Sequence, residues 1–381
     1  MPREVYTSSV APSLNDISWR EFLRRPAFEP PPPEVLDAFT SAPILVTGAG
    51  GSIGSALSLR LARYALPALL LLESGENNLC ELQRAMADDL KAFPRAAAPM
   101  AFALASAGDR TVMEALFTVH RPRIVFHAAA YKHVPLLEEQ PLAAIANNIF
   151  ATETITAVAS EYRTRVVLLS TDKAVEPASV MGATKRVAEE IVLASGGTVL
   201  RLGNVLASSG SVTEVFANQI AHGGPLTITD PAARRYFLTL DEAVNLVLLA
   251  SMHPNSSSLL APPLPAMHGI VELARYMSRQ LAPGREIPIH FTGLRPGDKL
   301  TERLWSDSDA TKPVGDGSLV SICISQLSPI QLQSGLAALH SAAEVHDISG
   351  ALAQLQSLVP DFHPSQTVLA LARHSGSRAC V

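Results

Sequence analysis

Short apolar runs alternate with longer amphipathic segments over residues 43–202. An apolar run bounded by turn residues predicts a buried strand, and apolar positions three or four residues apart predict a helix. We therefore expect strands over 44–47, 68–73, 124–127, 165–170 and 199–202, and helices over 53–64, 77–92, 111–120, 143–160 and one that ends near 193. Such alternation predicts a parallel sheet with right-handed crossovers. The expected fold class is α/β, a Rossmann-type doubly wound parallel sheet with a smaller C-terminal substrate-binding domain.

The pattern changes on both sides of this region. After residue 203, loops rich in Gly, Ser and Pro are interrupted by helical patterns over 241–250 and 270–280. The N-terminal part is polar and Pro-rich, with a short amphipathic helix expected within 15–25 and a polyproline segment over 29–33. The expected parts are an extension (1–41), a Rossmann domain (42–210, rejoined by 236–262), a substrate-binding domain (211–235 and 263–373) and a disordered tail (374–381).

Composition and charge narrow the function classes. Hydrophobic residues make up 48% of the chain but aromatic residues only 5%, as expected for aliphatic helices packed on a parallel sheet. A net charge of −5 without a basic run argues against a nucleic-acid partner. No apolar stretch approaches the ~20 residues of a membrane span, and we expect no signal peptide. The three cysteines have no metal-ligand spacing, so we expect no metal site and a cytoplasmic location.

A glycine-rich turn lies between the first expected strand and the first expected helix. Glycines there let the backbone approach a pyrophosphate, and the helix N-terminus offers N–H donors and a positive dipole. The turn therefore predicts a dinucleotide site, although a flavin, another nucleotide or a mere tight turn would use the same pattern. The candidate cofactor residues in the turn are Gly48, Gly50, Gly51, Ser52, Ile53 and Gly54.

Two further segments extend the predicted cofactor site. Glu73 ends the second strand, where an acid binds ribose hydroxyls, unless it is simply a solvated strand end. No cation follows it to meet a 2′-phosphate, so NAD is favoured over NADP. Ala128 and Ala129 follow the strand 124–127 and are small enough to let the cofactor lie close to the backbone. Lys132 and His133 come next and are candidate substrate contacts.

Candidate chemistry is concentrated after the strand 165–170. Thr171, Asp172 and Lys173 stand at its carboxyl end, where doubly wound α/β proteins hold their ligands. Met181 and Lys185 are four residues apart and share one face of the following helix. Met181 cannot transfer a proton, so the acid–amine pair of Asp172 and Lys173 is the expected reactive centre.

Four cations further along the chain are candidates for binding an anion. Arg295 and Lys299 flank a rigid Pro-Gly turn, and Arg201 and Arg235 are expected to reach the same group. Arg forks onto phosphate oxygens and Lys adds a point charge, so the set predicts a diphosphate clamp. The alternative interpretation is an exposed basic turn.

Together these segments resemble the UDP-N-acetylglucosamine 4,6-dehydratases of bacterial polysaccharide and glycoprotein pathways, in the extended short-chain dehydrogenase/reductase superfamily. In most short-chain dehydrogenases a Tyr precedes the helix Lys by four residues, and Met181 in that place is a feature of one branch of this family. Four positions depart from the family pattern, Ser106, Glu214, Arg234 and Asp298, and the segment 259–270 matches it poorly. The matching segments are 45–55, 127–135, 170–186, 201–212, 223–227, 235–237 and 291–297.

The resemblance implies a soluble, homo-oligomeric enzyme that acts on a UDP-sugar. Carbon 4 of the hexose would be oxidised by NAD, water would leave across carbons 5 and 6, and hydride would return to carbon 6. Thr171 would bind the 4-hydroxyl, Lys173 would remove the carbon 5 proton as a neutral amine, and Asp172 would protonate the departing hydroxyl. Lys185 would hold the nicotinamide ribose, and Asn204 would contact the substrate. An epimerase of the same superfamily and a non-catalytic NAD-binding sensor remain as alternatives.

Overall fold

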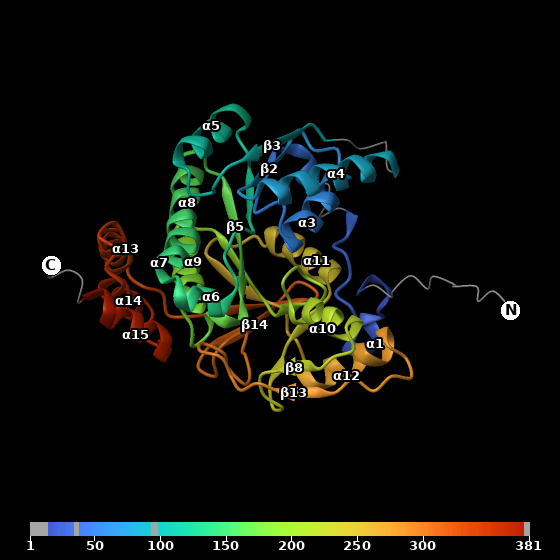
Figure 1. The fold of residues 1–381 in the computed structure, drawn as a ribbon. Helices are drawn as coiled ribbons and strands as arrows, with labels where there is room; N and C mark the ends of the chain where they lie inside the picture. The colour runs from blue at the N-terminus through green and yellow to red at the C-terminus, as the bar shows by residue number, and fades with distance from the viewer. Residues whose placement is uncertain (1–13, 34–37, 93–97, 377–381) are drawn as a thin grey trace.

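A nine-stranded sheet forms the centre of the molecule in the computed structural model, which describes residues 14–33, 38–92 and 98–376 (Figure 1). The strand order is β14-β15-β11-β6-β5-β4-β1-β2-β3, and all pairs are parallel except those that β15 makes. This order confirms the doubly wound Rossmann-type sheet. The strands are β1 Ile44–Thr47, β2 Leu69–Glu73, β3 Met100–Leu104, β4 Ile124–His127, β5 Arg165–Thr171, β6 Thr198–Leu202, β11 Ser258–Ala261, β14 Ala310–Val314 and β15 Leu319–Cys323.

Helices cover both faces of the sheet, as the alternating pattern predicts. One layer contains α3 (Ser52–Ala62), α4 (Glu76–Ala92) and α11 (Leu240–Ser251), and the other contains α5 (Arg110–His120), α8 (Ala151–Glu161) and α9 (Val180–Ala194). Two short helices, α6 (Val134–Glu139) and α7 (Pro141–Ile145), join β4 to α8. The helix expected over 143–160 is interrupted by a π-helical turn, Ala146–Phe150.

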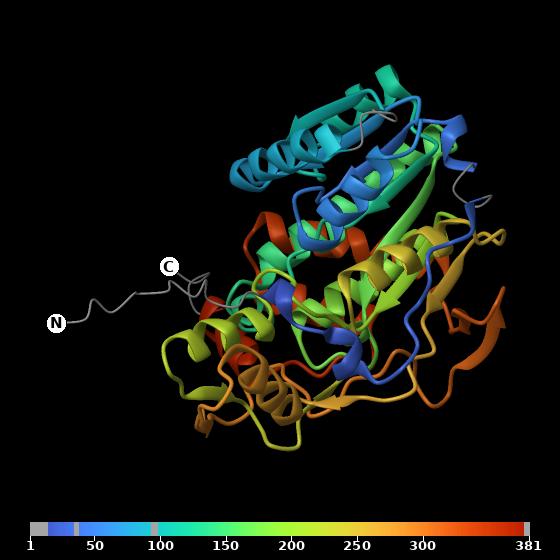
Figure 2. The ribbon, with the colours of Figure 1, turned by 90° about the vertical axis from the view of Figure 1, so that its right-hand side faces the viewer.

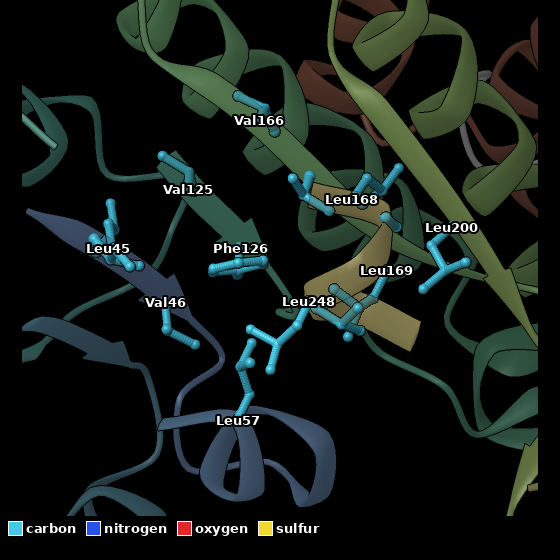
Figure 3. Packing of buried hydrophobic residues seen from close by; sticks show 14 of the residues in the cluster. Leu45, Val46, Leu57, Val125, Phe126, Val166, Leu168, Leu169, Leu200 and Leu248 are labelled. Atoms are coloured by element: carbon cyan, nitrogen blue, oxygen red, sulfur yellow. The ribbon is translucent and has the colours of Figure 1, made fainter. Parts of the chain in front are cut away.

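The main core lies between the sheet and these helices. Strand residues such as Leu45, Val46 and Phe126 are completely buried, and Leu57 of α3 and Leu248 of α11 point toward them from one layer (Figure 3). A parallel sheet is covered on both faces, so neither face of a central strand needs polar side chains. This is why the strands read as continuous apolar runs in the sequence.

A smaller unit lies below the carboxyl ends of the strands (Figure 2). It contains α10 (Val212–Ala221) and α12 (Ile270–Leu281), and β8 (Leu226–Ile228) pairs there with β13 (Ile289–Phe291). Two short ladders connect this unit to the Rossmann domain: β7 (Asn204–Val205) with β10 (Phe237–Leu238), and β9 (Arg234–Arg235) with β12 (His268–Gly269).

The N-terminal extension packs on the smaller unit. The helix expected within 15–25 is a 3-10 turn, Leu14–Asp16, followed by α1 (Trp19–Leu23). Phe22 and Leu23 are buried in the same apolar cluster as α10 and α12, in agreement with the predicted amphipathic face.

The C-terminal part is organised differently from the expected substrate-binding domain. The hairpin of β14 and β15 extends the main sheet, because β15 pairs with β11. The helices α13 (Pro329–Glu344), α14 (Ile348–Leu358) and α15 (Gln366–Gly376) form a second apolar cluster with α9, seen on the left of Figure 1. The tail expected from residue 374 begins inside α15, and residues 377–381 lie outside the described part of the chain.

One helical segment of the described residues, Pro141–Glu161, has the length and apolar character of a membrane span. Of its most apolar stretch, 56% is buried inside the protein. Buried core helices of globular proteins pass the same test, so the segment is weak evidence for a span.

Candidate functional site

The glycine-rich turn packs directly on the segment that follows β4. Gly48 has φ of +65°, and a Cβ there would lie 2.6 Å from Ala129 N and 2.8 Å from Ala128 C. A Cβ on Gly54 would overlap the Gly48 carbonyl oxygen. Glycine is therefore required for the turn to pack this closely at the N-terminus of α3, the end of a helix that binds a pyrophosphate in dinucleotide sites. Gly50, Gly51, Ser52 and Ile53 complete this turn between β1 and α3.

Glu73 is fixed at the edge of this turn. Its Oε2 accepts a hydrogen bond from Gly50 N at 3.0 Å and its Oε1 accepts one from Gly75 N at 2.9 Å. A carboxylate oxygen has more than one acceptor site, so each oxygen can also accept from a ribose hydroxyl. Turn, helix N-terminus and acid together fit a dinucleotide.

Two buried polar side chains, His127 and Asn148, lie behind the site. His127 lies between Thr47 Oγ1 (2.8 Å) and Thr152 Oγ1 (3.0 Å), and burial, reinforced by the charge of Lys185, lowers its pKa to about 3. Asn148, in the π-helical turn, accepts from Tyr131 N at 2.8 Å. A bulge of this kind is frequent at functional sites, but the sequence shows only an Asn pair inside a helical pattern.

The loop 207–211 connects the candidate substrate contacts to the glycine-rich turn. Lys132 Nζ donates to Ser209 O at 2.5 Å, and Ser209 N donates to Ser52 Oγ at 2.9 Å. The His133 ring lies so close to Gly210 that a Cβ there would be 2.6 Å from it. Glu214, one of the departures from the family pattern, accepts from Gly210 N at 2.7 Å. Lys132 and His133 thus lie beside the predicted cofactor turn.

At the end of β5 the chain turns at once into a 3-10 turn, Asp172–Ala174, capped by Thr171 Oγ1. This turn brings the acid and the amine together: Lys173 Nζ donates to Asp172 Oδ1 at 2.9 Å. Thr171 Oγ1 donates to the same oxygen at 2.9 Å. Asp172 is completely buried, and its Oδ2 has no hydrogen-bond partner among the described residues. The three residues therefore form one connected group.

The pKa of Lys173 is shifted in the opposite direction to the expected one. Its Nζ also donates to Asn204 Oδ1 at 3.1 Å and lies 3.9 Å from Glu302 Oε1. Burial alone lowers the pKa of Lys173, but the charges of Asp172 and Glu302 outweigh it, so this pKa is raised. Glu302, 3% exposed, was missed by sequence reasoning, although its spacing of three from Lys299 is a usable signal.

Helix α9 carries the other two predicted catalytic residues. Ser179 caps its N-terminus by accepting from Gly182 N at 3.1 Å. Met181 and Lys185 lie one turn apart and are 3% and 5% exposed. Lys185 Nζ donates to Leu169 O at 2.8 Å, and burial lowers its pKa to about 8, against the opposing charge of Glu189. Lys185 is therefore a buried cation that loses its proton easily.

The four cations expected to clamp a diphosphate are not brought together. Arg201 is 2% exposed, and its guanidinium bonds Glu189 through Nε (2.9 Å) and Nη2 (2.7 Å) and Leu304 O through Nη1 (3.1 Å). Arg201 belongs to the central strand β6, and its buried guanidinium is occupied by these partners, so it is not available to a substrate. A position on a central strand is the reason that the expectation fails for Arg201.

Arg235 and Lys299 hold the 295–302 segment in place. Arg235 donates to the carbonyl oxygens of Lys299 (2.8 Å) and Leu300 (3.0 Å), and Lys299 Nζ donates to Val175 O (2.9 Å). Arg295, in contrast, has a side chain that is 57% exposed and pairs with Asp298 at 2.8 Å. Of the four cations, Arg295 alone presents its charge to solvent.

Residues 44–322 match a family described as polysaccharide biosynthesis protein. The chain is 36% identical over 309 residues to the probable polysaccharide biosynthesis protein EpsC of Bacillus subtilis, covering 78% of the chain and 51% of EpsC. It is 34% identical over 289 residues to a UDP-glucose 4-epimerase of Rickettsia rickettsii, covering 72% of the chain and 80% of that protein.

The chain spans about half the length of EpsC and of a second relative, the capsular polysaccharide biosynthesis protein CapD of Staphylococcus aureus, of which 46% is covered at 38% identity over 71% of the chain. Among solved structures, Pen from Bacillus thuringiensis superposes with a TM-score of 0.68 at 23% identity, covering 78% of this chain and 97% of Pen. The superposition shows a shared fold, and at this identity it shows the fold alone.

Proposed function

Because this chain belongs to the polysaccharide biosynthesis protein family, we propose that it is an NAD-dependent 4,6-dehydratase of a UDP-N-acetylhexosamine, with UDP-N-acetylglucosamine as the first candidate. The product would be a UDP-4-keto-6-deoxy sugar, and the enzyme a carbon–oxygen lyase. One observation carries the proposal: Lys173 and Asp172 are hydrogen-bonded at 2.9 Å at the carboxyl end of β5. Their turn packs on α9, the helix in which Met181 stands where a proton donor is otherwise needed. Elimination of water requires a base and an acid together.

Thr171 has the geometry of a proton relay. When bound, NAD⁺ would accept the hydride of carbon 4 and later return it to carbon 6. A 4-hydroxyl group that donates to Thr171 Oγ1 can pass its proton on to Asp172 Oδ1, because these two oxygens already share a hydrogen bond of 2.9 Å. Asp172 thereby becomes the acid that the next step requires.

Lys173 then removes the carbon 5 proton, and Asp172 gives its proton to the departing 6-hydroxyl, which leaves as water. Lys173 returns a proton to carbon 5 after the hydride has reached carbon 6. Asp172 ends ionised and Lys173 ends neutral. These are the states in which the cycle starts once the resting Lys173 ammonium has released a proton to solvent, so the cycle balances. The pKa of Lys173 is raised mainly by Asp172 among the opposing charges, so neutralising Asp172 in the first step favours the neutral amine that the second step uses.

The remaining predicted residues support binding in this proposal. The turn 48–54, Glu73, Ala128 and Ala129 would hold NAD, and Lys185 would hold its nicotinamide ribose. Lys132, His133, Asn204 and Arg295 would surround the UDP-sugar. The proposal includes the expected cytoplasmic location and homo-oligomeric state, which cell fractionation and light scattering would test.

The test is to incubate the purified protein with UDP-N-acetylglucosamine, with and without NAD⁺, and to follow the sugar nucleotide by mass spectrometry and proton NMR. We expect loss of one water and a new methyl signal. Lys173→Ala should abolish turnover while NAD still binds, and Lys91→Ala, which removes an exposed lysine paired with Asp88, should leave turnover unchanged. Product formation by Lys173→Ala at the parental rate would refute the assignment.

An epimerase is the second candidate, because several relatives are named UDP-glucose 4-epimerase, including the one of Rickettsia rickettsii. Epimerisation at carbon 4 still needs a base for the 4-hydroxyl proton, a role for Thr171 and Asp172, but it needs no proton transfer at carbon 5 or carbon 6, so Lys173 would have no direct task. The same NMR experiment distinguishes the two: an epimerase yields a sugar of unchanged mass with an altered carbon 4 proton. Bound NAD without any change in sugar would favour the non-catalytic sensor.

A further inference from the structure

We propose that Arg25 is a positioning residue for Lys173: from the N-terminal extension it holds the short strand that presents Asn204 to the lysine ammonium. Of the two measurements that test this inference, only the kinetic one depends on the proposed function. Arg25 and Lys173 belong to distant parts of the chain, and two ladder strands, β10 and β7, connect them.

The Arg25 guanidinium is nearly buried and forms a bidentate pair with the Glu242 carboxylate. Its Nη1 and Nη2 contact the two carboxylate oxygens of Glu242 at 2.5 and 3.1 Å, and the two side chains are 9% and 4% exposed. Nη2 also donates to Phe237 O at 3.1 Å. A guanidinium can bind a carboxylate and a neighbouring carbonyl at once because its donors are arranged in a rigid plane. Arg25 therefore fixes β10 relative to the start of α11.

The Glu242 side chain cannot easily move away from Arg25, because the start of α11 holds it in place. It closes a capping box at the start of that helix, where Thr239 N donates to Oε2 at 2.9 Å and Glu242 N donates to Thr239 Oγ1 at 3.2 Å. Phe28 N donates to Oε1 at 3.2 Å, which attaches the N-terminal segment a second time. The anchor for Arg25 is therefore rigid.

The N-terminal segment is also packed against β10 through α1, which lies beside α12 in Figure 1. The Phe22 ring meets the Phe237 ring edge-on at 6.0 Å and the Tyr276 ring at 5.3 Å. Tyr276 Oη donates to Ser18 O at 2.6 Å. Phe237 is thus held by its backbone oxygen and by its side chain, both from the same short segment.

The connection to the reactive group is made through the ladder. Phe237 of β10 is in register with Asn204 of β7, and Asn204 N donates to Tyr236 O at 2.8 Å. Asn204 Oδ1 then accepts from Lys173 Nζ at 3.1 Å. Gly203 packs so closely on Tyr236 that a Cβ would lie 2.8 Å from its Cβ, so the two strands have little room to slide.

Asn204 is the neutral acceptor among the groups around the Lys173 ammonium. Asp172, Glu302 and Arg235 are the charged groups that affect it, and the first two favour the protonated amine. Loss of the Asn204 contact removes a hydrogen bond to the charged form and frees the Nζ to move. Displacement of Asn204 would therefore have two effects. Lys173 would lose its proton at a lower pH, and it would transfer protons to and from the substrate more slowly.

Three variants test the connection. Arg25→Lys keeps the charge beside Glu242 but lacks the fork that also reaches Phe237 O. Asn204→Ala removes the acceptor directly, and the double variant combines the two. Arg24→Ala is the matched control, because Arg24 is the adjacent residue, is 75% exposed and makes only a 3.9 Å contact to Glu272.

The readout that needs no turnover is the pH dependence of Lys173 acetylation by a trace of acetic anhydride, quantified by peptide mass spectrometry. We expect the midpoint to move to lower pH in Arg25→Lys and in Asn204→Ala, by similar amounts, with no further change in the double variant. In turnover, kcat should fall by about tenfold while KM changes little, since one hydrogen bond is lost at the reacting group. Arg24→Ala should match the parent in both.

Two outcomes would overturn the inference. An unchanged acetylation midpoint in Arg25→Lys, or additive shifts in the double variant, would show that Arg25 acts on stability alone. If Arg25→Lys lowers the melting temperature but keeps the parental acetylation midpoint, Arg25 likewise acts on stability alone. Absence of turnover in the parent, together with the expected midpoint shifts, would instead count against the dehydratase proposal and leave the positioning role standing.

Discussion

Replacing Gly48 by alanine isolates what the glycine-rich turn contributes to cofactor binding. The φ of +65° is a left-handed conformation that costs a residue with a Cβ about 1–2 kcal/mol. The new Cβ would lie 2.6 and 2.7 Å from Ala129 N and Cα and 2.8 Å from Ala128 C, where ordinary contacts begin at 3.4 Å. Relief of that overlap, about 0.6–0.8 Å of movement, costs about 1–3 kcal/mol more.

Because the turn must move away from the segment 128–129, affinity for NAD⁺ should fall together with stability. Loss of one charge-assisted hydrogen bond, about 1.5–3 kcal/mol, weakens binding by about ten- to hundredfold. Isothermal titration calorimetry gives the affinity, and thermal unfolding without cofactor gives the stability. Gly284→Ala is the control for affinity, because Gly284 has φ of +77° but its Cβ would meet no atom of the described residues within 4 Å. A Gly48→Ala protein that binds NAD⁺ within about threefold of the parent would refute this reasoning.

Three further changes have outcomes that follow from buried charges. Glu302→Gln removes a charge that raises the pKa of Lys173, so the rise of kcat with pH should move to lower pH; an unmoved profile would exclude Glu302 from the centre. The folded-state pKa of His127, about 3, lies below its unfolded value near 6.5, so the unfolded chain binds the proton more tightly and stability is lost as pH falls from 6.5 towards 3. Urea unfolding should show about 2 kcal/mol less stability at pH 5 than at pH 7.5 from this group, and His127→Gln should remove that part. Arg201→Leu leaves Glu189 buried without its main partner and should cost about 3–5 kcal/mol, whereas adding Glu189→Leu should restore much of it; equal losses in both would contradict a buried-charge origin.

The strands of the Rossmann domain could be predicted closely from sequence because burial on both faces demands unbroken apolar runs. The run 44–47 is β1 and the run 124–127 is β4, residue for residue. The C-terminal part could not be divided correctly in the same way. Its amphipathic helices carry the same pattern whether they cover a substrate or cover α9, and only tertiary packing distinguishes the two.

For the site, the spacing of residues in the sequence predicted which neighbours meet, but it did not predict the charges that surround Lys173 and Arg201. The turn after Thr171 brings Asp172 and Lys173 together as expected, since both belong to one short segment. The pKa of Lys173 is raised first by its sequence neighbour Asp172 and then by Glu302, which is far away in the sequence, so the expected direction was wrong. Arg201 is a cation by type, but its place on a central strand commits it to Glu189.

The packing of α13, α14 and α15 on α9 also has a consequence for how the protein is made. Glu138 accepts from Val180 N at the start of α9 and from Ser365 Oγ, just before α15, and His363 N donates to Pro177 O at 3.1 Å. These bonds join the turn that carries Lys173 to residues that a ribosome adds almost two hundred positions later. Synthesis proceeds at roughly 5–20 residues per second, so the Rossmann sheet can collapse many seconds before the helix beside it is enclosed. A nascent chain that ends before α13 would expose the apolar side of α9, and this side would be covered only after α15 has been made.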